Sequence, residues 1–402
     1  MTWKTFRLDD VCQIQSGNSI AAKKKTELFT NVFGTPYVAT KDVGFDGSID
    51  YENGIYIPKE HVSSFKISPS GSTLVCAEGG SAGRKIAFST NDCCYVNKMF
   101  SITPSESLEA KYIYYYTLSC EFQSQFKAAL HGLIGGVSLK KIKEFTISIP
   151  SLAEQQRIVA KLDVAFAEIE KLVTAQSSKL KETDSLVASA LEKMLMQHGK
   201  AVIPVELQSL CESNRGITYG VIKLGEEVEN GIPCLRTSNV KKRKIVTKGM
   251  KRIAGELSRE FERTILNGGE VLVNVRGTLG GVSVVPVDMA GWNISREVAM
   301  VPIDRYKASA DYISLWISSP TSEKWLHGNT KGAAYQGINL SDLRKLPVAL
   351  PDREVQDELV LQFKKLLRQT DTVKENIETA VNETATLKSA ILAKELQSSE
   401  AA

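Results

Sequence analysis

The feature that most constrains the fold of this chain is a segment that occurs twice, half a chain length apart. Pro150 and Pro351 lie 201 positions apart in a chain of 402 residues, and each stands between a short apolar run and a long segment rich in Ala, Leu, Lys and Glu. Shorter motifs match in the same order: Pro-x-x-x-Thr at 36–40 and 233–237, Gly-x-x-Gly at 80–83 and 277–280, and glycine-rich stretches at 131–136 and 331–337. A repeat of this length predicts two complete domains rather than a stack of small solenoid units.

The composition is that of an ordinary folded protein. Hydrophobic residues make up 43% of the chain and charged residues 24%, and a net charge of +4 neither requires nor excludes a polyanionic partner. The seven cysteines show no C-x-x-C spacing and the four histidines are scattered, so the sequence predicts reduced thiols and no metal site. The N-terminus lacks an apolar signal core, and no run approaches the roughly 18 apolar residues of a membrane helix. We therefore expect a soluble, cytoplasmic protein with no membrane partner.

The first globular half, residues 1–150, has the pattern of a mixed sheet. Short apolar runs such as 72–77 and 145–149 lie between turn signals and predict strands. One helix is expected at about 110–130. Its aromatic residues recur every three to four positions, which predicts packing onto the sheet rather than a base-stacking platform; they are Tyr112, Tyr115, Tyr116, Phe122 and Phe126.

Each segment after the repeated proline predicts one long helix. Helices over 152–197 and 355–397 would span about 69 and 65 Å. The first has a capping-box pattern at Ser151 and Glu154, and Asp352 is the candidate cap of the second. Apolar residues alternate three and four apart, as in a coiled coil. The residues expected at the interface of the two helices are Val159, Leu162, Phe166, Ile169, Val173, Leu180, Val187, Phe363, Leu366, Val373, Ile377 and Leu387.

The simplest partner for one long helix is the other, because each apolar stripe is too narrow to be stable alone. Only residues 199–202 separate the first helix from the second globular half, which leaves no room for the return that a parallel pairing would need. The fold class is therefore predicted as α+β. Two mixed-sheet globular domains, one at each end of an antiparallel coiled-coil pair, would be related by an approximate internal twofold axis.

Catalytic motifs are not evident in the sequence. The glycine stretch 79–83 is followed by a strand-like run rather than by the helix that a phosphate-binding loop needs, and no G-K-[ST] follows it. Asp92, Glu109 and Lys111 could mimic nuclease residues, but the second copy has Asp311 where Lys111 stands. No Asn-Pro-Pro-Tyr loop of an amino-methyltransferase occurs. These observations favour a binding protein with no catalytic residues.

Basic residues in the two globular halves are the candidates for a polyanion-facing surface. Arg84 and Arg276 flank the matched glycine turns, and the sequence match pairs Lys98 with Arg296. Basic groups at matched places suggest two equivalent DNA-facing surfaces. The predicted DNA-binding residues are Lys23, Lys24, Lys41, Arg84, Lys85, Lys98, Arg236, Lys241, Lys242, Arg243, Arg276 and Arg296, with Tyr335 and Gln336 as candidates for base contacts.

The junction at 149–163, Ile-Pro-Ser-Leu-Ala-Glu-Gln-Gln-Arg-Ile-Val-Ala-Lys-Leu-Asp, resembles that of the specificity subunits of type I restriction-modification enzymes. The second junction, from Pro351, lacks the Leu-Ala-Glu-Gln core. The resemblance implies target recognition domains at 1–150 and 201–350 that read two halves of a bipartite, asymmetric DNA sequence, with spacer helices at 151–200 and 351–402. It implies double-stranded DNA, two methyltransferase subunits and restriction (motor) subunits as partners. S-adenosylmethionine and ATP with Mg²⁺ would belong to those partners, and this chain would hold no cofactor.

Two other classes of function remain open at this point. One is the recognition subunit of a related methylation-only or phage-defence system. The other is a coiled-coil adaptor that binds only proteins, for which the modest net charge is the best argument. An independent enzyme ranks behind both, because no nucleophile or metal cluster is recognisable.

Overall fold

The computed structural model describes residues 3–131, 135–199, 202–328 and 337–396. The chain divides into two compact units, one formed by residues 1–176 with 378–402 and the other by residues 177–377. Each unit therefore contains one globular domain and parts of both long helices. Among the described residues, no helix is long and apolar enough to cross a membrane.

The first globular domain is built on two four-stranded sheets. One is antiparallel, in the order β2-β9-β6-β7, and the other has the order β4-β3-β8-β5 with β3 and β8 parallel. A separate ribbon pairs β1 with β10, which brings the start of the chain beside the strand before the first long helix. The strands are β1 Lys4–Arg7, β2 Cys12–Ser16, β3 Thr35–Val38, β4 Tyr56–Ile57, β5 Ile67–Ser68, β6 Thr73–Cys76, β7 Ile86–Phe88, β8 Cys93–Tyr95, β9 Met99–Pro104 and β10 Thr146–Ile149.

The second globular domain repeats this plan. An antiparallel sheet has the order β12-β20-β17-β18, a second sheet β16-β13-β19 contains the parallel pair β13 and β19, and a ribbon pairs β11 with β21. Its extra feature is the hairpin of β14 and β15. The strands are β11 Val205–Glu206, β12 Thr218–Tyr219, β13 Ile232–Leu235, β14 Val240–Lys241, β15 Lys244–Ile245, β16 Lys251–Ile253, β17 Val271–Asn274, β18 Val282–Val284, β19 Asn293–Ile294, β20 Val298–Val301 and β21 Pro347–Val348.

Short helices complete both domains. In the first domain they are α1 Leu8–Val11, α2 Ala22–Leu28, the 3-10 turn η1 Thr40–Asp42, α3 Lys59–Val62, α4 Ala110–Leu118, α5 Cys120–Ala128 and α6 Leu139–Lys143. In the second they are η2 Leu207–Leu210, α8 Gly255–Glu260, η3 Glu262–Thr264, η4 Val287–Met289, α9 Ala310–Ile317, α10 Pro320–Gly328 and α11 Leu340–Arg344. The long helices are α7 Leu152–Gly199 and α12 Arg353–Leu396.

The single helix predicted at about 110–130 is wrong, because the chain forms two helices there. Ser119 has extended backbone angles (φ −71°, ψ 158°), which end α4, and its hydroxyl accepts the backbone N–H of Phe122 and caps α5. The aromatic side chains behave as expected. Tyr112, Tyr115, Tyr116, Phe122 and Phe126 are all buried in the core of the first domain.

The predicted cap of the first long helix is present, but the capping box is only half formed. The backbone N–H of Glu154 donates to the Ser151 hydroxyl at 3.4 Å. The Glu154 carboxylate binds Arg157 instead of returning to the cap, with distances of 2.7 and 2.8 Å. Arg157, about one turn further along the helix, therefore binds the carboxylate that would complete the capping box.

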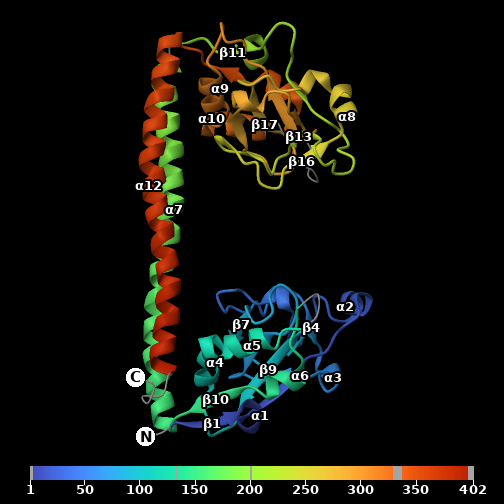
Figure 1. The fold of residues 1–402 in the computed structure, drawn as a ribbon, viewed down its shortest axis with the longest axis vertical. Helices are drawn as coiled ribbons and strands as arrows, with labels where there is room; N and C mark the ends of the chain where they lie inside the picture. The colour runs from blue at the N-terminus through green and yellow to red at the C-terminus, as the bar shows by residue number, and fades with distance from the viewer. Residues whose placement is uncertain (1–2, 132–134, 200–201, 329–336, 397–402) are drawn as a thin grey trace. The chain divides into compact units, whose positions relative to one another are not determined.

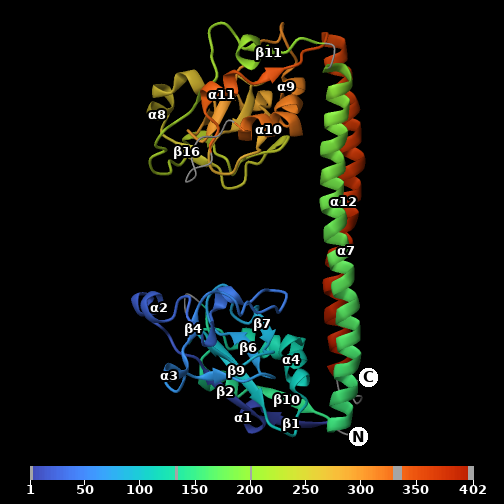
Figure 2. The same cartoon turned by 180° about the vertical axis from the view of Figure 1, so that it is seen from behind.

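The two long helices pack against each other in each unit, side by side as Figures 1 and 2 show. In the first unit, Leu162 near the start of α7 shares a core with Leu392 near the end of α12. In the second unit, Leu191 near the end of α7 shares a core with Phe363 near the start of α12. The pairing is therefore antiparallel, as the connectivity predicts.

Most of the residues expected in the seam between the helices are shielded from solvent. Val159, Leu162, Ile169, Val187, Phe363 and Ile377 are buried, and Phe166, Val173, Leu180 and Leu366 are partly buried. Val373 and Leu387 are corrections, because each is 47% exposed. The next residue takes the inner position in both cases: Lys374 pairs with Asp184, and the Lys388 ammonium lies 5.2 Å from the centre of the Phe166 ring. A lysine can fill such a position when its charge finds a partner and its stem covers apolar surface.

A buried glutamine joins each globular domain to the start of its long helix. The Gln155 side chain accepts the backbone N–H of Glu109 at 2.9 Å and donates to the carbonyl of Pro150 at 3.0 Å. Gln356 accepts from Ser309 at 2.9 Å and donates to Pro351 at 2.7 Å. Both side chains are 2% exposed. The two junctions are therefore structurally the same, although the second lacks the Leu-Ala-Glu-Gln core.

Candidate nucleic-acid interface

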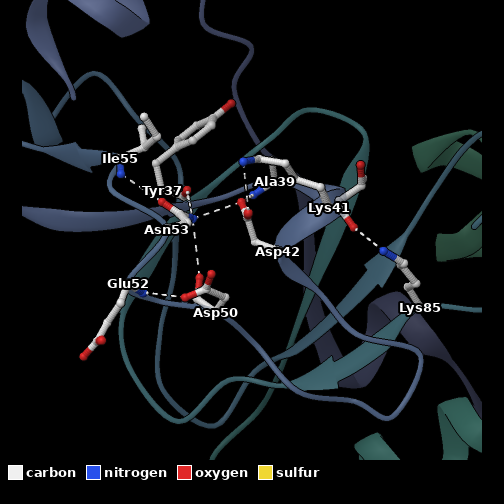
Figure 3. Close-up of polar contacts among 10 residues, drawn as sticks. Tyr37, Ala39, Lys41, Asp42, Asp50, Glu52, Asn53, Ile55 and Lys85 are labelled. Carbon is white, nitrogen blue, oxygen red and sulfur yellow. Dashed lines mark hydrogen bonds and ion pairs between the residues drawn. The ribbon is translucent and has the colours of Figure 1, made fainter. Parts of the chain in front are cut away.

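A short turn after the central strand of each globular domain holds the first candidate residues. In the first domain this threonine turn comprises residues 39–43 and contains η1. The buried Asp42 carboxylate accepts the backbone N–H of Ala39 and the side-chain amide of Asn53, both at 2.9 Å, as Figure 3 shows. The Lys41 side chain is 75% exposed, with its ammonium 3.6 Å from Asp42. The turn thus fixes its backbone through a buried carboxylate and leaves a cation at the surface.

The threonine turn of the second domain, residues 236–240, has the same internal bond. Asn239 accepts the backbone N–H of Arg236 at 3.0 Å, as Asp42 does from Ala39. Asn239 is fully buried and donates to the carbonyl of Val246. The two copies thus share one turn geometry, with the Asn239 amide in place of the Asp42 carboxylate. After the threonine, the first copy has Lys41 and the second has Ser238.

The two domains anchor the threonine turn differently. In the first, the Lys85 ammonium donates to the carbonyl of Thr40 at 2.9 Å, visible in Figure 3. In the second, the buried Asn274 amide donates to the carbonyls of Thr237 and Val240 at 3.3 and 3.1 Å. Lys85, a predicted DNA-binding residue, is therefore at least partly occupied in holding its own domain together.

Two of the predicted cations in the first domain gather over an exposed aromatic ring. The Arg84 guanidinium and the Lys85 ammonium lie 5.0 and 5.1 Å from the centre of the Phe45 ring, which is 62% exposed. The structure thus brings Lys41, Arg84 and Lys85 together around the threonine turn. Exposed cations beside an aromatic face suit a nucleic-acid backbone.

The remaining candidates of the first domain lie on other elements. Lys23 and Lys24 are exposed on α2, where the Lys23 ammonium is 3.9 Å from Glu27. Lys98 is exposed just before β9. None of these three contacts the cluster around Phe45 in the bonds and ion pairs of the described residues.

In the second domain, two predicted DNA-binding residues, Lys242 and Arg243, make contacts within the protein. Lys242 binds Glu323 of α10 at 2.7 Å. Arg243 has a positive φ of 66°, and its guanidinium lies 5.5 Å from the centre of the Phe363 ring on α12. Burial lowers the pKa of Arg243, against the opposite influence of Asp184 and other acids. The tip of the β14–β15 hairpin therefore packs on the long helices. The run of four basic residues at 241–244 does not by itself predict this left-handed turn.

The other candidates of the second domain differ in accessibility. Lys241, Arg276 and Arg296 are exposed. Arg236 is partly buried and donates to the carbonyl of Gly249 at 2.7 Å. Tyr335 and Gln336 lie outside the described residues.

Backbone hydrogen bonds give the true equivalence of the two copies and correct the sequence match. The N–H of Ala77 donates to the carbonyl of Lys98, and in the same place Val275 donates to Glu297. Lys98 is therefore equivalent to Glu297, and the match of Lys98 with Arg296 is wrong by one residue. A one-residue insertion between the matched motifs cannot be seen without the strand register.

The same register shows that Arg276 is the structural equivalent of an acidic residue, Glu78, in the first domain. Glu78 forms an isolated bridge with Gly136, and Arg276 forms the equivalent bridge with Gly337. Arg84 and Arg276 flank the glycine turn from opposite sides, so they do not occupy equivalent positions in the two domains. Asn97, which is equivalent to Arg296, and Glu78 are not cations, so a pattern of basic residues does not indicate them. The signal that could have revealed them is a difference in charge at matched positions.

Groups that could hold a metal are not found in this surface. Among the described residues, no cluster of three or more His, Cys, Asp or Glu side chains has the arrangement of a metal site.

Comparison with known proteins decides the family. The family model of the type I restriction modification DNA specificity domain matches this chain twice, over residues 1–181 and 203–383. The chain belongs to this family. The two matches correspond to the two copies of the repeat.

Relatives of the family cover nearly the whole chain. The type I restriction enzyme EcoBI specificity subunit of Escherichia coli is 22% identical, over 98% of this chain and 85% of the relative. The EcoKI specificity subunit of Escherichia coli strain K12 is 23% identical, over 87% and 79%. A chain from a solved type I restriction-modification complex has the same fold, with a TM-score of 0.70 at 19% identity and 98% coverage of both chains.

Proposed function

We propose that this chain is the specificity subunit of a type I restriction-modification complex and reads a bipartite, asymmetric DNA sequence. Each target recognition domain, residues 1–150 or 201–350, would read one half of the target. The helices at 151–200 and 351–402 would separate the two readers. The observation that carries the proposal is the repetition of one backbone frame with different surface side chains, such as Lys41 against Ser238. Identical copies would favour a palindromic target, whereas unlike copies suit an asymmetric one.

The set of residues that we propose to face DNA is smaller than the set predicted from the sequence. They comprise the exposed cations Lys41, Arg84, Lys98, Lys241, Arg276 and Arg296, with Lys23 and Lys24 on α2. Exposed cations of this kind would release counterions from the phosphate backbone and give salt-dependent affinity. Lys242 and Arg243 are left out because their charges meet acidic groups or the long helices. Lys85 and Arg236 are left out because each is partly buried and donates to a backbone carbonyl of its own domain.

As a specificity subunit, the chain is the non-catalytic component of its complex. It works with methyltransferase and restriction subunits, and S-adenosylmethionine and ATP are bound by those partners. We propose two methyltransferase subunits per chain, docked on the long helices, and a cytoplasmic location for the assembly.

The proposal is tested by mapping methylated adenines in cells that express the chain with its methyltransferase partner. We expect one sequence with two unlike halves and a gap of constant length. Exchange of residues 201–350 for the equivalent domain of a relative should change one half only. Methylation without a common sequence, or a change in both halves, would contradict the proposal.

A further inference from the structure

One pair of positions combines an identical backbone frame with opposite side-chain chemistry in the two domains. The frame is a strand end held against the glycine-rich stretch. In the first domain, Val137 N–H donates to the carbonyl of Ala77 at 3.0 Å and Glu78 bridges Gly136. In the second, Ile338 donates to Val275 at 2.8 Å and Arg276 bridges Gly337. The backbone positions of Glu78 and Arg276 are thus the same.

The glycine of each bridge leaves room for the side chain that faces it. A Cβ at Gly136 would lie 3.1 Å from the Cβ of Glu78, and a Cβ at Gly337 would lie 3.5 Å from the Cγ of Arg276. The backbone at both glycines has no positive φ. A Cβ would therefore crowd the Glu78 side chain at Gly136, whereas at Gly337 it would be in ordinary contact with Arg276.

A second position accompanies the first in each domain. Glu78 and Asn97 are both exposed and line one shallow pocket of about 350 Å³, together with Ser16, Gly136 and Ser138. The structural equivalent of Asn97 is Arg296, because the carbonyls of the following residues, Lys98 and Glu297, accept equivalent backbone bonds. Arg276 and Arg296 are also exposed. The pair is thus Glu–Asn in one domain and Arg–Arg in the other.

These side chains do not serve the stability of their domains through polar bonds. Within the described part of the chain, the side chains of Glu78, Asn97 and Arg276 form no hydrogen bond or ion pair. Arg296 has only its neighbour Glu297 at 3.3 Å. An exposed carboxylate is repelled by phosphate, so a Glu on a DNA-facing surface is better explained by a base contact than by a backbone contact.

We propose that these two positions read bases, Glu78 and Asn97 in one half of the target and Arg276 and Arg296 in the other. The inference rests on the proposed function and names its specificity-determining residues. A carboxylate accepts from the amino group of cytosine, an asparagine forms two bonds with adenine, and an arginine forms two bonds with guanine. The first half-site therefore contains a C or A at the contacted positions, and the second half-site contains G.

The test is methylome mapping with the full chain and its methyltransferase partner. The variants are Glu78→Gln, Arg276→Gln and the control Glu106→Gln, which changes an exposed acid outside the two positions. Glu78→Gln should alter the base preference at one position of one half-site, and Arg276→Gln at one position of the other. Discrimination at that base should fall by about tenfold to a hundredfold. The control should leave both halves unchanged.

Two results would overturn the inference. One is an unchanged target for both variants, with methylation as complete as in the wild type. The other is a uniform loss of affinity, measured with a set of duplexes that carry each base substitution, since a phosphate contact weakens binding to all sequences alike. Wild-type complexes that methylate without sequence preference would instead contradict the proposed function itself.

Discussion

Asp311 on α9 and Lys364 on α12 form an ion pair with a nitrogen–oxygen distance of 2.7 Å. The equivalent pair of the first unit, Lys111 on α4 and Asp163 on α7, has the same distance and the opposite polarity. The charge of both members is reversed between the two units. The residue on each globular domain is therefore opposite in charge to its partner on the long helix. The substitution of Lys111 by Asp311, which counts against a nuclease site in the sequence, is explained by this reversal.

Charge reversal in the second unit tests the importance of that pairing. Asp311→Lys or Lys364→Asp alone should lower the melting temperature at low salt, because each places like charges side by side. The double variant should restore most of the loss. The two side chains are 45% and 53% exposed, so the coupling energy should be modest, about 0.2–1 kcal/mol. A double variant that is as unstable as the two single losses combined would show that the pair contributes nothing.

The buried glutamines should contribute more than any surface ion pair. Gln155→Leu and Gln356→Leu each remove two hydrogen bonds and leave a backbone N–H without its acceptor, partly buried at Glu109 and buried at Ser309. We expect the free energy of unfolding to fall by about 1–3 kcal/mol in each variant, measured by denaturant titration. Gln156→Leu, at an exposed neighbouring position, is the matched control. Equal losses for Gln155→Leu and Gln156→Leu would contradict the assigned role.

Substitution of Arg243 should affect stability, whereas substitution of Arg276 should affect DNA affinity. Arg243→Met should destabilise the second unit, because its guanidinium packs on Phe363 near acidic groups, and should leave the salt dependence of DNA binding unchanged. Arg276→Met should leave the melting temperature unchanged and weaken DNA binding. Both are measured on the chain assembled with its methyltransferase partner. The reverse distribution of effects would contradict the placement of these residues.

The features predicted well from the sequence are those that depend on periodic patterns. The repeat, the two long helices and their antiparallel pairing follow from apolar spacing and from the short connection after α7. The seam at Val373 and Leu387 was mispredicted, because a heptad pattern cannot tell that a neighbouring lysine finds an acidic or aromatic partner on the other helix.

The candidate site was less legible, because its geometry depends on register. The equivalence of Lys98 with Glu297, rather than with Arg296, depends on which backbone carbonyl accepts from Ala77 and from Val275. Arg243 stands in a basic run that resembles a DNA-binding patch, and only its positive φ and its contact with Phe363 show its direction. The equivalence of Glu78 with Arg276 is visible only in the backbone bonds of the two domains.

The central claim, that the helix pair sets the gap between two unlike half-sites, is tested most directly by lengthening both helices. One heptad is inserted after Gln176 and one after Ile377, where the two units divide, so that the three-four spacing of the seam continues. Seven residues add about 10 Å, which corresponds to about three base pairs. Mapping of methylated adenines should then show both half-sites unchanged and the gap longer by about three base pairs. An unchanged gap with full methylation would contradict the claim.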